Sequence, residues 1–523
     1  MKFGAVYCLY EDYEFLEMSL SSIKDKLDKI IFLVSDIPWN GKPSNNNDLL
    51  EKLNCLCKKN SNFELIKDHW ANEVDQRNFA LKYFYKNNFD YCFIIDSDEI
   101  YHDYHFENIK SFILKNPNIS AFHIEWNTYW KKQYYVVYPR ETFTPVIAVK
   151  VDSFQFTHIR QGITSILRTE SFVFNTKERY NGILIPNNLA ICFHLSYART
   201  NERIERKLET SSHTKEFYKN WYDDVWLKWK PENKNLHPVT PSQYKQAIQE
   251  NFLVFPNQLK KFIKKERFEN NKCSIIILNW NSYNLLINCL NLILENTISF
   301  NEIIIIDNGS DNLPEDFVCL LKSNYNIDKV VLNKVNLGFA AGVNQGIKIA
   351  NEENDICLLN VDAEPQKNWL SELYNTLINN DTCGIAGSLG NEIENGYQNE
   401  NFVKEDTKVF NLHFYCVLVL RDLINKIGFL DEVFGLGSYE DNDFCIRSML
   451  AGYQCWISAK SLVRHKAHQV FKINNVDNKK LEEKNKALLE NKLIEAFYKM
   501  GSSIDLIFSL PELSRKCRLV IKN

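Results

Sequence analysis

Glycine and proline are scarce in this 523-residue chain, with 17 and 13 copies. Such counts leave little room for long disordered tracts. No uninterrupted apolar run reaches the ~18 residues that a membrane span needs. Charge of either sign has no large excess, because 62 basic and 66 acidic residues leave a net charge of -4. No bulk field therefore favours nucleic acid, and we expect a globular protein with no nucleic-acid partner.

Paired cysteine motifs are absent as well. The 14 cysteines include a CxC at Cys55 and Cys57, but no paired CxxC motif that would suggest a zinc site. Several others, such as Cys92 and Cys357, lie inside apolar runs, where a buried reduced thiol is the default. The apolar run at the amino terminus is too short for a secretion signal. We expect a cytoplasmic protein.

Two long segments of the chain follow one plan. Each opens with an apolar strand (KFGAVYCLY and CSIIILNWN) and continues through a helical stretch to a second strand that ends in acid (KIIFLVSD and EIIIIDNGSD). Strands that alternate with helical patterns predict a mostly parallel α/β sheet. The length of the chain already predicts at least two domains, and a repeat of long period favours duplicated ones.

The composition of the segments between and after the two copies sets the predicted domain boundaries. Prolines break the middle segment, and the run from Ser242 to Glu269 has roughly helical apolar spacing. After Asp477 a charged amphipathic helix precedes a basic, partly apolar end, LPELSRKCRLVIKN. Packing onto the second domain is the simpler interpretation of this end, and weak attachment to an anionic membrane face is the alternative. The predicted parts are domain 1 (1–228), a helical connector (229–271), domain 2 (272–475) and a helical tail (476–523).

An acidic motif follows a buried strand in each copy. DYCFIIDSDEIY contains Asp96 and Asp98, and NDICLLNVDAEP contains Asn360 and Asp362. Like charges this close cost free energy unless a cation sits among them. Two carboxylates at a strand end can share Mg²⁺ or Mn²⁺, which keeps open positions for phosphate oxygens. Ligands bind at this edge of parallel sheets, so each copy predicts a metal site.

A histidine follows each acidic motif at a similar distance. His194 lies 96 positions after Asp98, and His465 lies 103 positions after Asp362. An imidazole that completes the metal shell suits Mn²⁺ better than Mg²⁺. A lone strand histidine is usually a core residue, so His194 as a ligand depends on the repeat alone.

The motifs of the second copy together resemble the family 2 glycosyltransferases of the GT-A fold. IIILNWNSYNLLINCL, IIIIDNGSDN, NLGFAAGVNQGIKIA, LLNVDAEP and GLGSYEDNDFCIRSMLAGY occur in the family's order, with a downstream histidine, over roughly residues 273–470. The sequence looks most like the rhamnosyltransferase-like members that build bacterial surface polysaccharides. The resemblance implies two Rossmann-like α/β domains for nucleotide-diphospho-sugars, a UDP-, GDP- or dTDP-sugar donor, and a glycan or lipid-linked acceptor.

Roles for individual residues follow from the same resemblance. Asp362 matches the metal carboxylate, although the first acidic position of that motif is Asn360 here. An inverting transfer needs a carboxylate that accepts the proton of the acceptor hydroxyl. The acids of EDND could instead simply begin a helix, because acidic residues are favoured at a helix amino terminus. The implied residues are Asp307 for the nucleotide, Asn336, Gly338 and Asn344 along the donor, Asp441 as general base with Glu440 beside it, and His465 as a metal or phosphate ligand with His468 competing.

The first copy is more divergent but keeps the fuller acidic motif. DHWANEVDQRNFALKYF ahead of FDYCFIIDSDEIY, and the later HLSYARTNERIERK, resemble another branch of the same superfamily. The implied residues are Asp36 near the nucleotide, Arg77 and Asn78 near the donor, and Asp96, Asp98 and His194 at the metal. No counterpart of EDND precedes the histidine, and four candidates for a base stay open: Glu125, Glu141, Asp152 and Glu170.

These patterns favour a bifunctional glycosyltransferase that adds two sugars to a growing bacterial surface glycan or lipid-linked intermediate, with inversion in domain 2. The alternative is one active domain 2 with domain 1 as a silent glycan-binding module. A nucleotidyltransferase would need a basic Gly-rich loop near the amino terminus, which AVYCLYEDYEF lacks. A glycosidase would also use two carboxylates, but not a repeated nucleotide-site pattern. Mn²⁺ or Mg²⁺ is the expected cofactor, and the expected location is cytoplasmic or peripheral at the inner face of the cell membrane.

Overall fold

The structure is a computed structural model in which the chain divides into two compact units, Met1–Lys260 and Lys261–Asn523. The division falls inside the predicted connector. Each unit is described by itself below. The described residues are 1–37, 45–154, 156, 172–173, 179–180, 182–210, 216–297, 300, 302–327, 329–389, 404–465 and 468–500, with only the backbone described for the two short segments at 172–180 and for 494–500.

A seven-stranded sheet forms the centre of the first unit. Its strands are β1 (Phe3–Leu9), β2 (Lys29–Ser35), β3 (Phe63–Asp68), β4 (Tyr91–Ile94), β6 (Ala121–His123), β9 (Val146–Lys150) and β12 (Gly182–Leu184). They lie in the order β12-β6-β9-β4-β1-β2-β3. β4, β1, β2 and β3 are parallel, whereas β9 is antiparallel to both of its neighbours. The parallel core confirms the strand pattern predicted for this copy.

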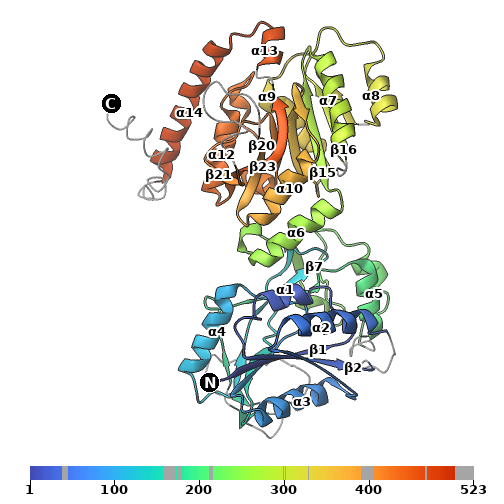
Figure 1. The fold of residues 1–523 in the computed structure, drawn as a ribbon, viewed down its shortest axis with the longest axis vertical. Helices are drawn as coiled ribbons and strands as arrows, with labels where there is room; N and C mark the ends of the chain where they lie inside the picture. The colour runs from blue at the N-terminus through green and yellow to red at the C-terminus, as the bar shows by residue number, and fades with distance from the viewer. Residues whose placement is uncertain are drawn as a thin grey trace. The chain divides into compact units, whose positions relative to one another are not determined.

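Helices cover both faces of this sheet, as Figure 1 shows for α2 and α3. Alternate residues of β1 point to opposite faces: Tyr7 packs in the cluster that holds Leu53 of α2, and Val6 packs in the cluster that holds Phe84 of α3. Gly4 carries no side chain where a Cβ atom would lie 2.1 Å from the Phe84 ring. The helices of this unit are α1 (Leu16–Ser21), α2 (Asn47–Lys59), α3 (Glu73–Lys86), α4 (Asp103–Lys115) and α5 (Asn201–Thr210).

A second sheet in this unit carries the late histidine segment. Its order is β14-β8-β7-β13-β5. The strands are β5 (Glu99–Ile100), β7 (Trp126–Trp130), β8 (Tyr135–Tyr138), β13 (Cys192–Tyr197) and β14 (Gln246–Gln249), and a separate pair is formed by β10 (Phe172–Val173) and β11 (Arg179–Tyr180). This unit also has a short π-helix, η1 (Tyr222–Trp226), and two 3-10 helices, η2 (Pro241–Gln243) and η3 (Phe252–Val254).

The connector differs from its helical prediction. Only α6 (Asn257–Glu269) is an α-helix, because β14 pairs antiparallel with β8, with Ala247 opposite Val137. Ala247 is buried while the next residue, Ile248, is exposed, because successive side chains of a strand point to opposite faces. The helical prediction is therefore wrong for residues 246–249. It overlooked that a short stretch of mixed apolar and polar residues fits both periods.

The second unit is built on a nine-stranded sheet. The order along its main path is β17-β16-β15-β18-β22-β20-β23-β19, with β21 paired to β23. β17, β16, β15 and β18 are parallel. The strands are β15 (Cys273–Asn279), β16 (Glu302–Asp307), β17 (Lys329–Leu332), β18 (Asp355–Asn360), β19 (Ala363–Pro365), β20 (Cys383–Leu389), β21 (Thr407–Val409), β22 (Cys416–Val419) and β23 (Gln454–His465).

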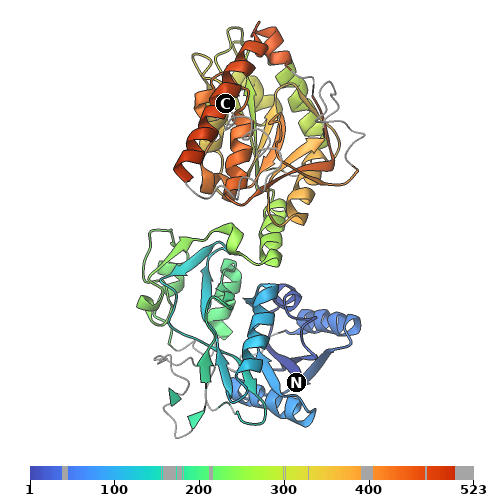
Figure 2. The same cartoon turned by 90° about the vertical axis from the view of Figure 1, so that its left-hand side faces the viewer.

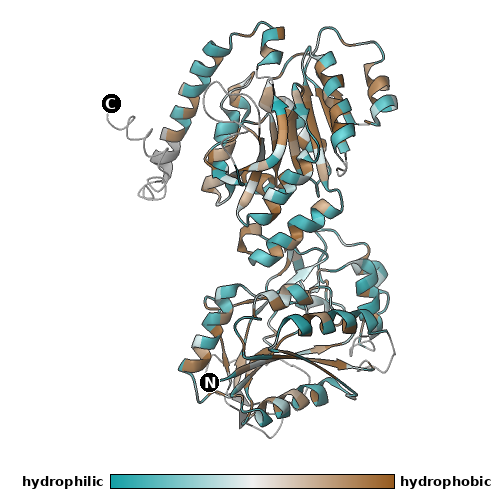
Figure 3. Ribbon diagram, in the orientation of Figure 1, coloured by the Kyte–Doolittle hydropathy of each residue, from teal (hydrophilic) through white to brown (hydrophobic). Residues whose placement is uncertain are grey.

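Apolar strands lie inside this unit and amphipathic helices surround them, as Figures 2 and 3 show. Ile275 and Ile305 have no exposed surface, which explains why β15 and β16 read as continuous apolar runs. The helices are α7 (Tyr283–Asn296), α8 (Phe317–Tyr325), α9 (Phe339–Ile349), α10 (Trp369–Asn379), α11 (Arg421–Ile427), α12 (Glu440–Leu450), α13 (Gln469–Ile473) and α14 (Asn478–Met500), with a short turn η4 (Glu432–Phe434). Among the described residues, no helix has the length and apolar character to cross a membrane.

The two large sheets share one sequence of strand directions. Four parallel strands (β3-β2-β1-β4 and β17-β16-β15-β18) are followed by an antiparallel strand, β9 or β22, and then by a strand antiparallel to that one, β6 or β20. This order matches the repeat that the sequence predicts.

Candidate functional site

The parallel strands of the second unit end together at one edge of the sheet. Asn279 pairs in register with Asp307, and Leu278 pairs with Asn360, so the last residues of β15, β16 and β18 are neighbours. Asp307 is buried, and its carboxylate accepts hydrogen bonds from the Asn279 amide at 2.7 Å and from the hydroxyl of Ser310 at 2.7 Å. These bonds fix the turn after β16, where the nucleotide is expected.

The predicted donor loop before α9 is held by the side chain of Asn308. The amide of Asn308 donates to the side chain of Asn336 at 2.7 Å and to the carbonyl of Gly338 at 3.1 Å. Gly338 has φ +95°, and a Cβ atom there would lie 2.1 Å from the carbonyl oxygen of Gly435. Only glycine fits this close approach.

Asn344 has a different environment from the one predicted. Its amide donates to the carbonyl of Leu430 and to the carboxylate of Glu432, both at 2.9 Å, and accepts from the Leu430 backbone at 3.1 Å. The side chain therefore joins α9 to the turn before η4. Its place along the donor remains a prediction.

Asp362 and His465 meet, as the spacing predicts. Oδ1 of Asp362 lies 3.2 Å from Nε2 of His465, because β19 pairs antiparallel with β23 and puts Ala363 opposite the histidine. Among the described residues, neither atom makes a hydrogen bond, although both are buried. Buried polar atoms normally have partners, so these two converging atoms fit the ligands of a cation. Asn360 ends the preceding strand, two positions before Asp362.

A short segment before β22 joins this pair to the predicted catalytic residues. The ring of Tyr415 stacks on His465, with centroids 4.5 Å apart. Two positions earlier, Nδ1 of His413 lies 3.5 Å from Oδ2 of Asp441. Two residues of chain span at most about 7 Å, so this short segment links Asp441 to His465. Sequence reasoning missed His413 and Tyr415, because neither belongs to the motifs that signalled the site.

Glu440 and Asp441 begin α12, and both side chains are buried. Burial, together with the charge of Asp441, raises the pKa of Glu440 to about 8, so its carboxyl is largely neutral at pH 7. The hydrogen bond with Asp441 raises the pKa of His413. This arrangement leaves Asp441 as the charged carboxylate of the pair, with an imidazole that orients it. Within the described residues, Oε2 of Glu440 has no hydrogen-bond partner.

His468, the competing ligand, contacts Asn478 and not Asp362 among the described residues. It precedes α13 with φ +64°, and its ring nitrogen lies 3.4 Å from the amide of Asn478. His465, not His468, makes the contact with the acidic residue.

In the first unit, Asp98 and His194 also meet. Oδ1 of Asp98 lies 3.8 Å from Nε2 of His194, and β5 pairs with β13 so that Glu99 is opposite the histidine. This register repeats the one between Ala363 and His465. In both units the residue after the aspartate therefore faces the late histidine.

A cation within the chain already compensates Asp98. Nη2 of Arg199 lies 3.0 Å from Oδ2 of Asp98 and 2.6 Å from Oδ2 of Asp12. Burial alone would raise the pKa of Asp98, but the charges of His194 and Arg199 outweigh it and hold that pKa well below its ordinary range. Arg199 therefore supplies the positive charge for which the sequence predicted a metal ion. Arg199 stands in the HLSYAR segment, but only the fold reveals its partner 101 positions away.

The other predicted residues of the first unit form ion pairs or hydrogen bonds with residues of the same unit. Buried Arg77 forms an ion pair with Glu73 and lies 3.6 Å from Asp96. The amide of Asn78 donates to the Phe156 carbonyl at 2.8 Å and accepts from its N–H at 2.9 Å. Asp36 lies just past β2 in an exposed pair with His69 at 3.0 Å.

Among the candidate bases, Glu141 has the environment that suits proton transfer. Burial raises its pKa to about 7, although hydrogen bonds with Thr128 and Tyr244 lower it. Thr128 also lies 3.4 Å from His194. Glu125 forms an ion pair with Arg140. The other two are Asp152, which is 53% exposed and 3.9 Å from Lys150, and Glu170, which lies outside the described residues.

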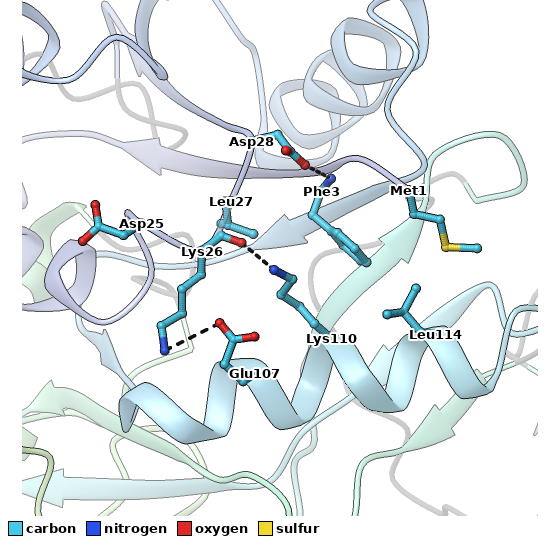
Figure 4. A pocket seen from close by; sticks show the side chains of 9 residues that line it. All are labelled: Met1, Phe3, Asp25, Lys26, Leu27, Asp28, Glu107, Lys110 and Leu114. Carbon is cyan, nitrogen blue, oxygen red and sulfur yellow. Dashed lines mark hydrogen bonds and ion pairs between the residues drawn. The ribbon is translucent and has the colours of Figure 1, made fainter.

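A pocket of about 450 Å³ opens elsewhere on the first unit, at the start of β1. Figure 4 shows Lys110 donating to the carbonyl of Lys26 at 2.8 Å and Asp28 accepting from the backbone of Phe3 at 2.7 Å. Phe3 is the first residue of β1. The pocket therefore lies at the amino end of the strand, whereas the predicted residues gather past the carboxyl ends.

In the described part of the chain, no group of three or more His, Cys, Asp or Glu side chains is placed to hold a metal ion. The thirteen cysteines described there are all free thiols. Asp362 and His465 therefore offer two protein ligands, and further positions would fall to a ligand or solvent.

Comparison with protein families matches residues 274–436 to the model described as "Glycosyl transferase family 2". The match ends before Glu440, Asp441 and His465, so the geometry above is what places these residues. No curated protein matches the chain significantly.

Solved structures with similar parts have low identity and low TM-scores. One is GalNAc-T7 with UDP, GalNAc and Mn²⁺, at 16% identity over 37% of this chain and 43% of that one, with a TM-score of 0.34. Another is S. aureus TarS 1–349, at 18% identity over 39% and 63%, with a TM-score of 0.32. Its complex with UDP-GlcNAc matches at 18% over 37% and 58%, with a TM-score of 0.31. Less than two thirds of each solved chain is covered. What the family comparison establishes is that residues 274–436 form a glycosyl transferase family 2 domain within the second unit.

Proposed function

We propose that the second unit is an inverting glycosyltransferase that takes a sugar from a nucleotide-sugar donor. The observation that carries this proposal is the family 2 match over residues 274–436, in a unit where the segment of His413 and Tyr415 contacts both Asp441 and His465. A fold does not by itself define a function. The specific groups of this site therefore have to account for the chemistry.

Asp441 is the proposed general base. Its carboxylate takes the proton of the acceptor hydroxyl while the acceptor oxygen forms a bond to the anomeric carbon of the sugar. The bond from that carbon to the diphosphate breaks on the opposite face, and its electron pair leaves with the nucleoside diphosphate. His413, 3.5 Å away, orients the carboxylate. Neutral Glu440 beside it avoids a second negative charge next to the base.

Asp362 and His465 are the proposed ligands of a divalent cation, Mn²⁺ or Mg²⁺. Their converging atoms lack hydrogen bonds among the described residues, which supports this assignment. When bound, such an ion neutralises charge that develops on a departing diphosphate. Asp307 and the loop at Asn336 and Gly338 would hold the nucleotide and the donor.

We further propose that the first unit is a second transferase, which makes the protein bifunctional. The common strand order and the repeated register of His194 and His465 support this. Glu141 is then the proposed base of that unit. The acceptor class, a bacterial surface glycan or a lipid-linked intermediate, rests on the resemblance of the motifs.

One observation favours the other candidate, a first unit that only binds and positions glycan. Arg199 already pairs with Asp98 at 3.0 Å, so the acid there does not need a metal for charge balance. Nucleotide binding by an Asp362→Ala chain separates the two. Calorimetric binding of nucleotide sugar that persists in this variant and is lost when Asp98→Ala is added to it supports a second donor site, whereas absence of any residual binding in Asp362→Ala supports the glycan-binding module.

The experiment that tests the main proposal incubates the full chain with UDP-, GDP- and dTDP-sugars and Mn²⁺ and records which nucleoside diphosphate is released. Release from at least one donor, reduced by Asp441→Asn, is the expected result. A chain that binds donors but releases none in the presence of acceptor glycans would contradict transferase activity.

A further inference from the structure

We infer that α14 positions the proposed base, with Asn485 as the central positioning residue; this rests on the proposed function of the second unit. The argument begins with the segment ahead of α12. Gly435 and Gly437 have φ values of +66° and +141°, and Ser438 and Tyr439 have +74° and +75°. Positive φ at such non-glycine residues is strained, and it persists only where the surroundings impose it. Glu440 follows this strained segment directly.

Asn485 imposes that conformation from outside the segment. Its side chain has no exposed surface. Its amide nitrogen donates to the carbonyls of Phe434 at 2.7 Å, Gly437 at 2.7 Å and Ser438 at 3.1 Å. These carbonyls cannot enter helical hydrogen bonds of α12 because their residues precede it, so the three share the two N–H groups of this one side chain.

The rest of α14 fixes the two flanks of the same segment. Nζ of Lys492 lies 2.6 Å from Asp431 before it and 2.5 Å from Asp443 after it. Leu489 packs in one cluster with Phe434 and residues of α12. Figure 1 shows α14 running beside α12, in agreement with these contacts.

The opposite side of the segment touches the donor loop. The backbone N–H of Phe339 donates to the carbonyl of Gly435 at 3.1 Å, where Gly338 makes its close approach. Asn308 holds the donor loop independently of α14. Release of Asn485 should therefore displace Asp441 relative to the donor while donor binding is retained. A misplacement of 1 Å can cost about 100-fold in rate.

The test uses the full chain and whichever UDP-, GDP- or dTDP-sugar the wild type turns over, with release of the nucleoside diphosphate as the readout. Asn485→Leu keeps the size of the side chain and removes its donors. We expect kcat to fall about 10- to 100-fold with KM for the donor within about twofold. Lys486→Ala, an exposed position on the same helix, is the matched control and should behave as wild type.

A second variant and a stability control keep the result decisive. Gly437→Ala places a Cβ atom at φ +141° and disturbs the segment from its other side, so it should show the same loss of kcat even if Asn485→Leu does not fold. Leu321→Ala removes a buried apolar side chain from α8, outside the cluster that joins α14 to α12, and should lower Tm while kcat is retained. If Asn485→Leu, or Gly437→Ala in its place, lowers only Tm as Leu321→Ala does, or raises KM in proportion to the loss of rate, the inference is overturned. Absence of turnover by the wild type would instead reject the proposed function itself.

Discussion

Loss of the Arg267 side chain should nearly unfold the second unit. This arginine of α6 is buried, and its Nη1 lies 3.1 Å from Oδ1 of Asp355 and 2.6 Å from Oδ2 of Asp422. Both carboxylates are buried as well. Burial raises the pKa of Asp355, and the arginine opposes that rise. The substitution Arg267→Met therefore removes the cation that pairs with both buried acids and leaves them the charge of Arg421 alone as compensation.

The magnitude follows from these contacts. Breaking a buried ion pair by removing one partner costs about 3–5 kcal/mol, and here one cation serves two acids. A domain has a free energy of unfolding of about 5–15 kcal/mol. Lys265→Met on the same helix is the control, because its pair with Glu269 is 59% exposed on both sides and such pairs contribute about 0.3–0.5 kcal/mol.

Urea denaturation of the fragment 257–523, followed by the fluorescence of buried Trp369, measures this difference. The same reasoning predicts that a fragment 272–523, which lacks α6, is unstable, although the repeat alone would place the domain boundary at residue 272. The explanation fails if Arg267→Met lowers the unfolding free energy no more than Lys265→Met does, or if the shorter fragment is as stable as the longer one.

Three further outcomes are expected. The pKa of Glu440 is raised in the folded protein, so its contribution to the free energy of unfolding is fully present below about pH 4.5 and is lost as pH rises to about 8. Between pH 5 and pH 8 the free energy of unfolding should therefore decline less in Glu440→Gln than in wild type, as measured by denaturation. Equal declines would contradict the shift in pKa. Arg199→Met should destabilise the first unit by about 3–5 kcal/mol, because Asp98 and Asp12 lose their shared cation; Tm by calorimetry checks this, and an unchanged value would show that the acids are not held by the arginine. Asp362→Ala should abolish the increase in nucleotide-sugar affinity that Mn²⁺ gives the second unit, and calorimetry with and without chelator would reveal an unaffected increase if the metal binds elsewhere.

The sequence was a good guide to features with local or periodic signals. Apolar runs predicted β1, β2, β15 and β16, and the repeat predicted that a distant histidine meets each acidic motif. Both histidines do so, since β5 and β19 place the residue after the aspartate opposite them. Similar spacing in the two copies, 96 and 103 positions, carried that information even though the partners are far apart in the sequence.

Ion pairs between residues far apart in the sequence left no such signal. Arg199 pairs with acids 101 and 187 positions away, and nothing in a single sequence distinguishes it from a surface arginine. The same limit explains Asn344, whose motif suggested a donor contact while its amide is occupied by Leu430 and Glu432. Asn485 lies in a charged helical stretch that the sequence marks only as amphipathic. Tertiary packing alone gives these residues their roles.

The most direct measurement of the central claim compares the wild-type chain with Asp441→Asn for nucleotide-sugar binding and for release of nucleoside diphosphate in the presence of Mn²⁺. The variant keeps the size of the side chain and removes the charge that accepts the proton. We predict unchanged donor affinity and a loss of turnover of about 10²–10⁴-fold. Turnover equal to that of the wild type, or a parallel loss of donor binding, would contradict Asp441 as the general base of a nucleotide-sugar transferase.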